Sequence, residues 1–149
     1  MIEPAQLHES LCHILGNTCR LSRTAKSYEW NVSGRGAVLA QACFREQAEA
    51  MHMSIDPLAG HIVDLGGHAV LDYSDGVVAV NPPTANGIPT LREMVRNLHE
   101  GHRQAIHSVG AAIDVAREAD DESTVQLMAT HQAAHRAWRR RLALVEQDV

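Results

Sequence analysis

The sequence predicts an all-α fold, built as a four-helix bundle. Apolar residues recur at steps of three and four along four long segments, and glycine, proline and asparagine collect between those segments. Aromatic residues make up only 3% of a chain that is 45% hydrophobic. A core poor in aromatics must be filled by aliphatic residues and methionine, which suits helix packing better than sheet packing. Residues 1–149 are expected to form a single domain.

The first two helices are expected over residues 4–31 and 37–65. Pro4 suits the first turn of a helix. A Ser-Gly-Arg-Gly turn at residues 33–36 separates the two helices, and a Gly-Gly pair ends the second. Because the connection is short, the two helices are expected to be antiparallel neighbours.

Two further helices are expected, one from Thr90 to about residue 119 and one that ends near residue 146. Thr90 and Glu93 form a capping-box pattern, and an acidic Asp-Asp-Glu-Ser link suits the boundary between the two helices. Residues 68–89 hold three of the five prolines and are expected to form a long crossover with room for one short helical turn. Two antiparallel hairpins joined by a crossover have the connectivity of a ferritin-like bundle.

Several classes of protein are excluded by composition. The formal net charge of −5 argues against nucleic-acid binding by charge alone, and no apolar run is long enough to span a membrane. The first residues lack the basic and apolar regions of a signal peptide, so a cytoplasmic location is expected. Cys12, Cys19 and Cys43 have no Cys-x-x-Cys spacing and are expected to be free thiols in a reducing compartment.

A sequence signature appears at the end of the first helix. Residues 28–34, Tyr-Glu-Trp-Asn-Val-Ser-Gly, resemble the His-Trp-Asn-x-x-Gly signature of the Dps family (DNA protection during starvation) of mini-ferritins. The similarity continues without a gap to the Leu-Gly-Gly at residues 65–67. The resemblance implies a ferritin-like bundle that assembles into a homo-oligomer, a dimer or a dodecameric cage, and that oxidises and stores iron. Many family members bind DNA, but an acidic chain without a lysine-rich tail is not expected to do so.

The resemblance also implies an iron site between two subunits, built in the family from two His, two Asp and one Glu. The five matching positions here are Glu29, Gln41, Arg45, Asp56 and Gly60. One ligand is therefore kept, one is replaced by another residue able to bind metal, and one is replaced by a cation. The sequence departs from the ferroxidase pattern of the family.

The first candidate metal set lies on the second helix. His52 and Asp56 are four residues apart, so their side chains point the same way. With Glu29 of a neighbouring subunit they offer two carboxylates and an imidazole to iron or zinc. Arg45 supports an alternative, in which a guanidinium beside Glu29 and Asp56 forms a salt-bridge cluster in place of a metal. The sequence leaves both interpretations open.

The second candidate set lies inside the bundle. His102, His131 and His135 fall on the core-facing lines of the third and fourth helices. His102 and His135 are almost equally far from the turn between these helices and are expected in one layer. Glu49, which opens a Glu-x-x-His pattern with His52, is expected nearby. The alternative is that the histidines bond to each other or to the backbone.

Two functions remain open from the sequence alone. In the first, the protein is a Dps-like mini-ferritin that binds iron, or another transition metal such as zinc, for storage and protection against oxidative stress. Whether it also oxidises Fe(II) is left open. In the second, it is a non-catalytic oligomeric scaffold or binding module whose metal site has been replaced by a salt bridge.

Overall fold

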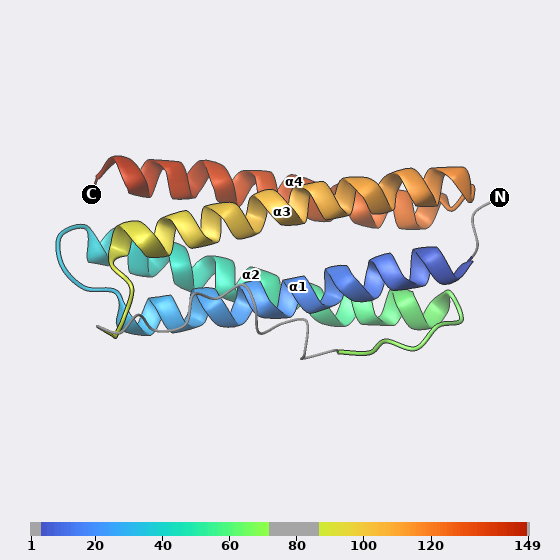
Figure 1. Cartoon of the computed structure of the whole chain (residues 1–149), viewed down its shortest axis with the longest axis horizontal. Coiled ribbons are helices and arrows are strands. Elements are labelled where there is room, and N and C mark those ends of the chain that lie inside the picture. Colours follow the sequence, from blue (N-terminus) through green and yellow to red (C-terminus); the bar gives the residue numbers. More distant parts are fainter. Residues whose placement is uncertain (1–3, 72–86, 149) are drawn as a thin grey trace.

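The computed structural model describes residues 4–71 and 87–148, which form a bundle of long helices lying side by side (Figure 1). The helices are α1 Pro4–Asn31, α2 Ala37–Asp64, α3 Leu91–Glu118 and α4 Glu122–Gln147. The predicted all-α bundle is confirmed, with helix ends close to those expected. The helical turn expected in the crossover falls largely on residues 72–86, outside the described residues. None of the described helices is long and apolar enough to cross a membrane.

The bundle consists of two antiparallel hairpins. The short turns after α1 and α3 fold each helix back on the next, and α2 ends at the end of the bundle opposite to the start of α3 (Figure 1). Between the hairpins, α1 packs on α3 more extensively than α2 packs on α4. The predicted ferritin-like connectivity is therefore present, and side chains of α2, α3 and α4 can meet inside the bundle.

Local signals in the sequence set the helix boundaries. Gly36 precedes α2 with a φ of 84°, and Gly66 follows it with a φ of 88°. Glycine adopts such left-handed angles without a steric penalty, so the chain can turn sharply at both ends of α2. The predicted capping box starts α3: the Thr90 hydroxyl accepts from the Glu93 backbone N–H, and the Glu93 carboxylate accepts from the Thr90 N–H. Asp121 caps α4.

The buried apolar residues form two clusters along the bundle. One is centred on Phe44 and Leu98, and the other on Leu11 and Met128. On α4, the buried residues between these clusters are His131 and His135. The core is therefore interrupted near its middle by a layer that contains imidazoles.

Candidate metal sites

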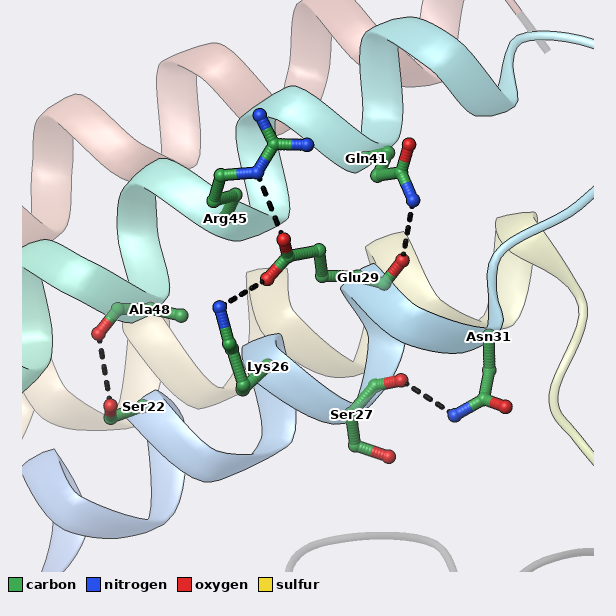
Figure 2. A network of polar contacts seen from close by, with 8 residues as sticks. All are labelled: Ser22, Lys26, Ser27, Glu29, Asn31, Gln41, Arg45 and Ala48. Atoms are coloured by element: carbon green, nitrogen blue, oxygen red, sulfur yellow. Dashed lines mark hydrogen bonds and ion pairs between the residues drawn. The ribbon is translucent and has the colours of Figure 1, made fainter.

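An ion cluster occupies the junction of α1 and α2 (Figure 2). Glu29, near the end of α1, is 8% exposed, and each of its carboxylate oxygens faces a cation. Oε2 lies 2.8 Å from Lys26 Nζ, and Oε1 accepts a hydrogen bond from Arg45 Nε at 2.9 Å. The hydrogen bonds from Lys26 and then Arg45 hold the pKa of Glu29 below its ordinary value. Gln41 Nε2 donates to the Glu29 carbonyl at 3.0 Å and joins α2 to α1 at the same place.

This cluster bears directly on the first candidate metal set. Two cations around one carboxylate leave a net charge of about +1, and an arginine cannot lose its proton to relieve it. A divalent metal at Glu29 would therefore meet repulsion rather than the negative charge that attracts it. The sequence left open a salt-bridge cluster of Arg45 with Glu29 and Asp56. The Arg45–Glu29 ion pair is present in the structure, and Asp56 takes no part in it.

His52 and Asp56 lie on the outer face of α2, and both are exposed. His52 borders a shallow cleft of about 320 Å³ between α1 and α2, lined by Ser22, Arg23, Lys26, Ala48, Glu49 and His52. Within residues 4–71 and 87–148, no group of three or more His, Cys, Asp or Glu side chains is placed so as to hold one metal ion. The first candidate set therefore requires a residue from a second copy of the chain.

Two histidines of the second candidate set meet inside the bundle. His102 of α3 is 0% exposed and His135 of α4 is 1% exposed, and their Nδ1 atoms lie 2.8 Å apart. On its other side, His102 Nε2 lies 2.7 Å from Oε1 of the buried Gln47 on α2. A chain of hydrogen bonds thus joins three helices across the core.

The partners of these rings determine where the protons lie. Since Gln47 Oε1 only accepts, His102 Nε2 must carry a proton and donate it. A neutral His102 then has a bare Nδ1, which accepts from the Nδ1–H of His135. Burial, followed by the nearby His135, lowers the pKa of His102 to about 3. Burial and then His131 lower the pKa of His135 to about 4, so both rings are neutral near pH 7.

The remaining members of the second set lie further away. His131 is 7% exposed and lies one turn before His135 on α4, and burial lowers its pKa. Glu49 is exposed on α2, and the structure does not bring it to the histidine layer. Gln47, two positions earlier, contacts His102 in its place. Gln47 is not among the site residues predicted from the sequence, although its spacing of three from Phe44 and four from Met51 places it on the core face of α2.

A further histidine, His61, joins the two hairpins where α2 ends and α4 begins. His61 Nε2 lies 2.7 Å from Thr124 Oγ1, and the Thr124 hydroxyl donates to Asp121 Oδ2 at 2.6 Å. Because the hydroxyl proton is used on Asp121, Thr124 must accept from His61 Nε2–H. This chain connects the last turn of α2 to the N-cap of α4.

Comparisons with known proteins agree with this architecture. The family model for the ferritin-like domain matches residues 8–136. The chain belongs to the ferritin-like family. Among curated proteins, it is 26% identical over 102 residues to the "DNA protection during starvation protein" of Brevibacillus brevis, which covers 68% of each chain. Its similarities make it a Dps-like member of the family.

Solved structures of ferritin-like proteins share the whole fold. The crystal structure of a Dps protein from Bacillus brevis has a TM-score of 0.85 at 21% identity, covering 97% of this chain and 98% of that one. A dodecameric thioferritin, the bacterioferritin-related protein of Bacteroides fragilis, has a TM-score of 0.88 at 18% identity, covering 99% and 88%. At these identities the likeness establishes the fold, and the chemistry must be argued from this chain's own residues.

Proposed function

We propose that this Dps-like protein assembles into a homo-oligomer that takes up and stores iron and protects the cell against oxidative stress. The names of its relatives support the class of function: one is a DNA protection during starvation protein, and another, 25% identical, is the general stress protein 20U of Bacillus subtilis. The observation that carries the proposal is the outer face of α2, where potential metal ligands lie among exposed apolar residues.

That face has the character of an interface between copies. Val38, Met53 and Val63 are 86%, 76% and 57% exposed, and their spacing places them on the same side of α2 as His52 and Asp56. Exposed apolar side chains grouped on one helix face are a feature of surfaces that bind another protein. A two-fold pairing of this face buries the same residues on both copies and creates two equivalent sites.

Iron would enter this interface as the substrate. His52 and Asp56 of one copy offer an imidazole and a carboxylate, and Glu29 of a second copy is the third ligand of the set proposed from the sequence. Glu29 can bind Fe(II) only after Lys26 or Arg45 moves away from its carboxylate. We therefore expect Fe(II) oxidation here to be slow, with Asp56 as the principal anionic ligand.

The scaffold function remains the second candidate, and a specific observation favours it. In the Lys26–Glu29–Arg45 cluster the Glu29 carboxylate is already paired with two of the chain's own cations, so this junction offers no unpaired negative charge to a metal. Under this alternative the oligomer forms, but it retains no iron.

The experiment that separates the two functions measures assembly and iron together. Untagged protein is loaded with Fe(II) in air, and the iron that co-elutes with the oligomer is compared for wild type, Asp56→Asn and Asp114→Asn. Asp114 is an exposed carboxylate on α3 and serves as the matched control. Iron storage at the interface predicts less retained iron in Asp56→Asn only. An oligomer that retains no iron in any variant supports the scaffold, and a monomer contradicts both proposals.

A further inference from the structure

His102 and His135 point their Nδ1 atoms at each other and share one hydrogen-bond proton between them. Two metal-binding histidines are arranged in the same way, with a metal ion in place of the proton. Gln47 holds the proton of His102 on Nε2, which leaves the Nδ1 lone pair directed at His135 Nδ1. A metal-bound histidine commonly donates its other ring N–H to an oxygen in the same way, and this second contact fixes the ring. If the His135 proton moves from Nδ1 to Nε2, two bare nitrogens face each other.

The surroundings of the pair restrict the charge of any cation that binds there. Among the buried residues that the structure describes, the only carboxylate is Glu29, which is already bound by Lys26 and Arg45. A cation between His102 and His135 therefore has no anionic partner. Because the cost of desolvating an ion rises with the square of its charge, a monovalent cation costs about one quarter as much as Fe(II) or Zn(II).

The donor atoms restrict the chemistry of the cation further. The pair supplies two imidazole nitrogens, whereas zinc and iron sites are completed by four or more ligands, commonly with carboxylates or thiolates. Two neutral imidazole donors without a carboxylate suit copper in its reduced, monovalent state.

We propose that His102 and His135 form a two-coordinate site for Cu(I) in the core of the bundle. Two nitrogens on opposite sides of a metal lie about 4 Å apart when each bond is about 2 Å, so the rings must separate by about 1 Å from their contact at 2.8 Å. Both imidazoles remain neutral, because the proton changes place on His135 and is not released. The site is independent of iron storage at the α2 face, since it uses neither His52 nor Asp56.

The test measures Cu(I) affinity under anaerobic conditions, by competition with the chromophoric chelator bicinchoninate. Thiols also bind Cu(I), so the parent protein carries Cys12→Ser, Cys19→Ser and Cys43→Ala. We expect this parent to retain a single Cu(I) per chain, with a nitrogen-dominated first shell in its X-ray absorption spectrum. His135→Leu should lower the affinity by roughly 100-fold or more, as expected when a ligand is lost rather than its supporting hydrogen bond.

Two further variants make the result specific to this pair. Gln47→Leu keeps both histidines but removes the acceptor of the His102 proton, and we expect about a tenfold loss of affinity. It also tests the proposal if His135→Leu fails to fold. His107→Leu removes an exposed histidine of α3 and should change nothing. Loss of all Cu(I) binding in the cysteine-free parent would overturn the proposal, as would unchanged affinity in folded Gln47→Leu and His135→Leu.

Discussion

His102 Nδ1 and His135 Nδ1 share a hydrogen bond of 2.8 Å in the middle of the bundle, and Gln47 determines which of the two rings donates it. The arrangement gives each of the two buried imidazoles a hydrogen-bond partner that is not a charged residue. Buried polar groups are costly unless they are bonded, so this contact allows histidines to occupy positions that apolar residues fill elsewhere in the core. It also makes the stability of the fold sensitive to protonation.

The metal-free protein should lose stability as the pH falls from about 6.5 toward 4. The folded-state pKa values of His102 and His135, about 3 and about 4, lie below the ordinary value of 6.5. Over this window the unfolded chain binds protons that the folded chain does not, so acid favours unfolding. Each histidine contributes a slope of up to about 1.4 kcal/mol per pH unit. Urea unfolding at a series of pH values, at fixed protein concentration, measures the slope.

The control for the pH prediction replaces the pair as a unit. In His102→Leu/His135→Leu both titratable rings are absent, and the buried atom that loses its partner, Gln47 Oε1, does not titrate. The pH dependence of its unfolding free energy should be shallower than that of the wild type between about pH 6.5 and 4. An equally steep dependence in the double variant would place the acid sensitivity at other groups.

The capping box of α3 should contribute measurably to stability. Thr90→Ala removes the hydroxyl that accepts from the Glu93 N–H, and an N-cap of this kind is worth about 1 kcal/mol. Thr130→Ala is the matched control, because Thr130 is an exposed threonine inside α4 that bonds only to its own helix. In denaturant unfolding, the free energy of unfolding should be lower for Thr90→Ala than for the wild type, and close to the wild-type value for Thr130→Ala. Equal stability of the two variants would show that the crossover holds the start of α3 without the cap.

The fold was predictable because each of its signals is local. Gly36 and Gly66 mark the ends of α2, and Thr90 with Glu93 marks the start of α3; each acts within a few residues of its own position. The long second connection then determined how the hairpins are joined. The four helices and the capping box could be predicted because signals of such short range can be read from a single sequence.

The site was less predictable because its contacts are not local. That His102 and His135 share a layer followed from counting residues from one turn, but that Gln47 joins them depends on how α2 packs against the other hairpin. The Glu-x-x-His pattern of Glu49 and His52 also gave Glu49 a place near this layer, whereas the structure leaves Glu49 exposed on α2. The ligand sets themselves, including His131, remain predictions for metal-binding experiments.

Thr124 should be important for holding the two hairpins together. Its buried hydroxyl accepts from His61 and donates to Asp121, so Thr124→Val keeps the shape but leaves both partners without their bond. We expect a loss of about 1–3 kcal/mol in the free energy of unfolding. The double variant Thr124→Val/Val125→Thr carries a hydroxyl one position away from the original one. We do not expect this hydroxyl to restore the lost stability. If Thr124→Val had the same denaturant midpoint as the wild type, the prediction would be wrong, and water would be replacing the hydroxyl as the partner of His61 and Asp121.

Arg45 should limit both the binding and the oxidation of Fe(II) at the outer face of α2. Its guanidinium lies 2.9 Å from Glu29 Oε1, at the position where the Dps pattern has an aspartate. Arg45→Asp removes a positive charge and adds a carboxylate one helical turn from Glu49, so Fe(II) should be held more tightly and oxidised faster. A unit charge at about 4 Å changes the binding energy by about 1–4 kcal/mol in wet surroundings, so we expect at least about a fivefold rise in the initial rate. Arg96→Asp, at an exposed position on α3, makes the same change in charge and controls for the effect of net charge on iron uptake.

If both variants respond equally, the effect is long-range steering and Arg45 has no particular role. If Arg45→Asp leaves the rate unchanged in an intact oligomer, Glu29 and Asp56 do not form an iron site, and the scaffold function is the better account of this interface.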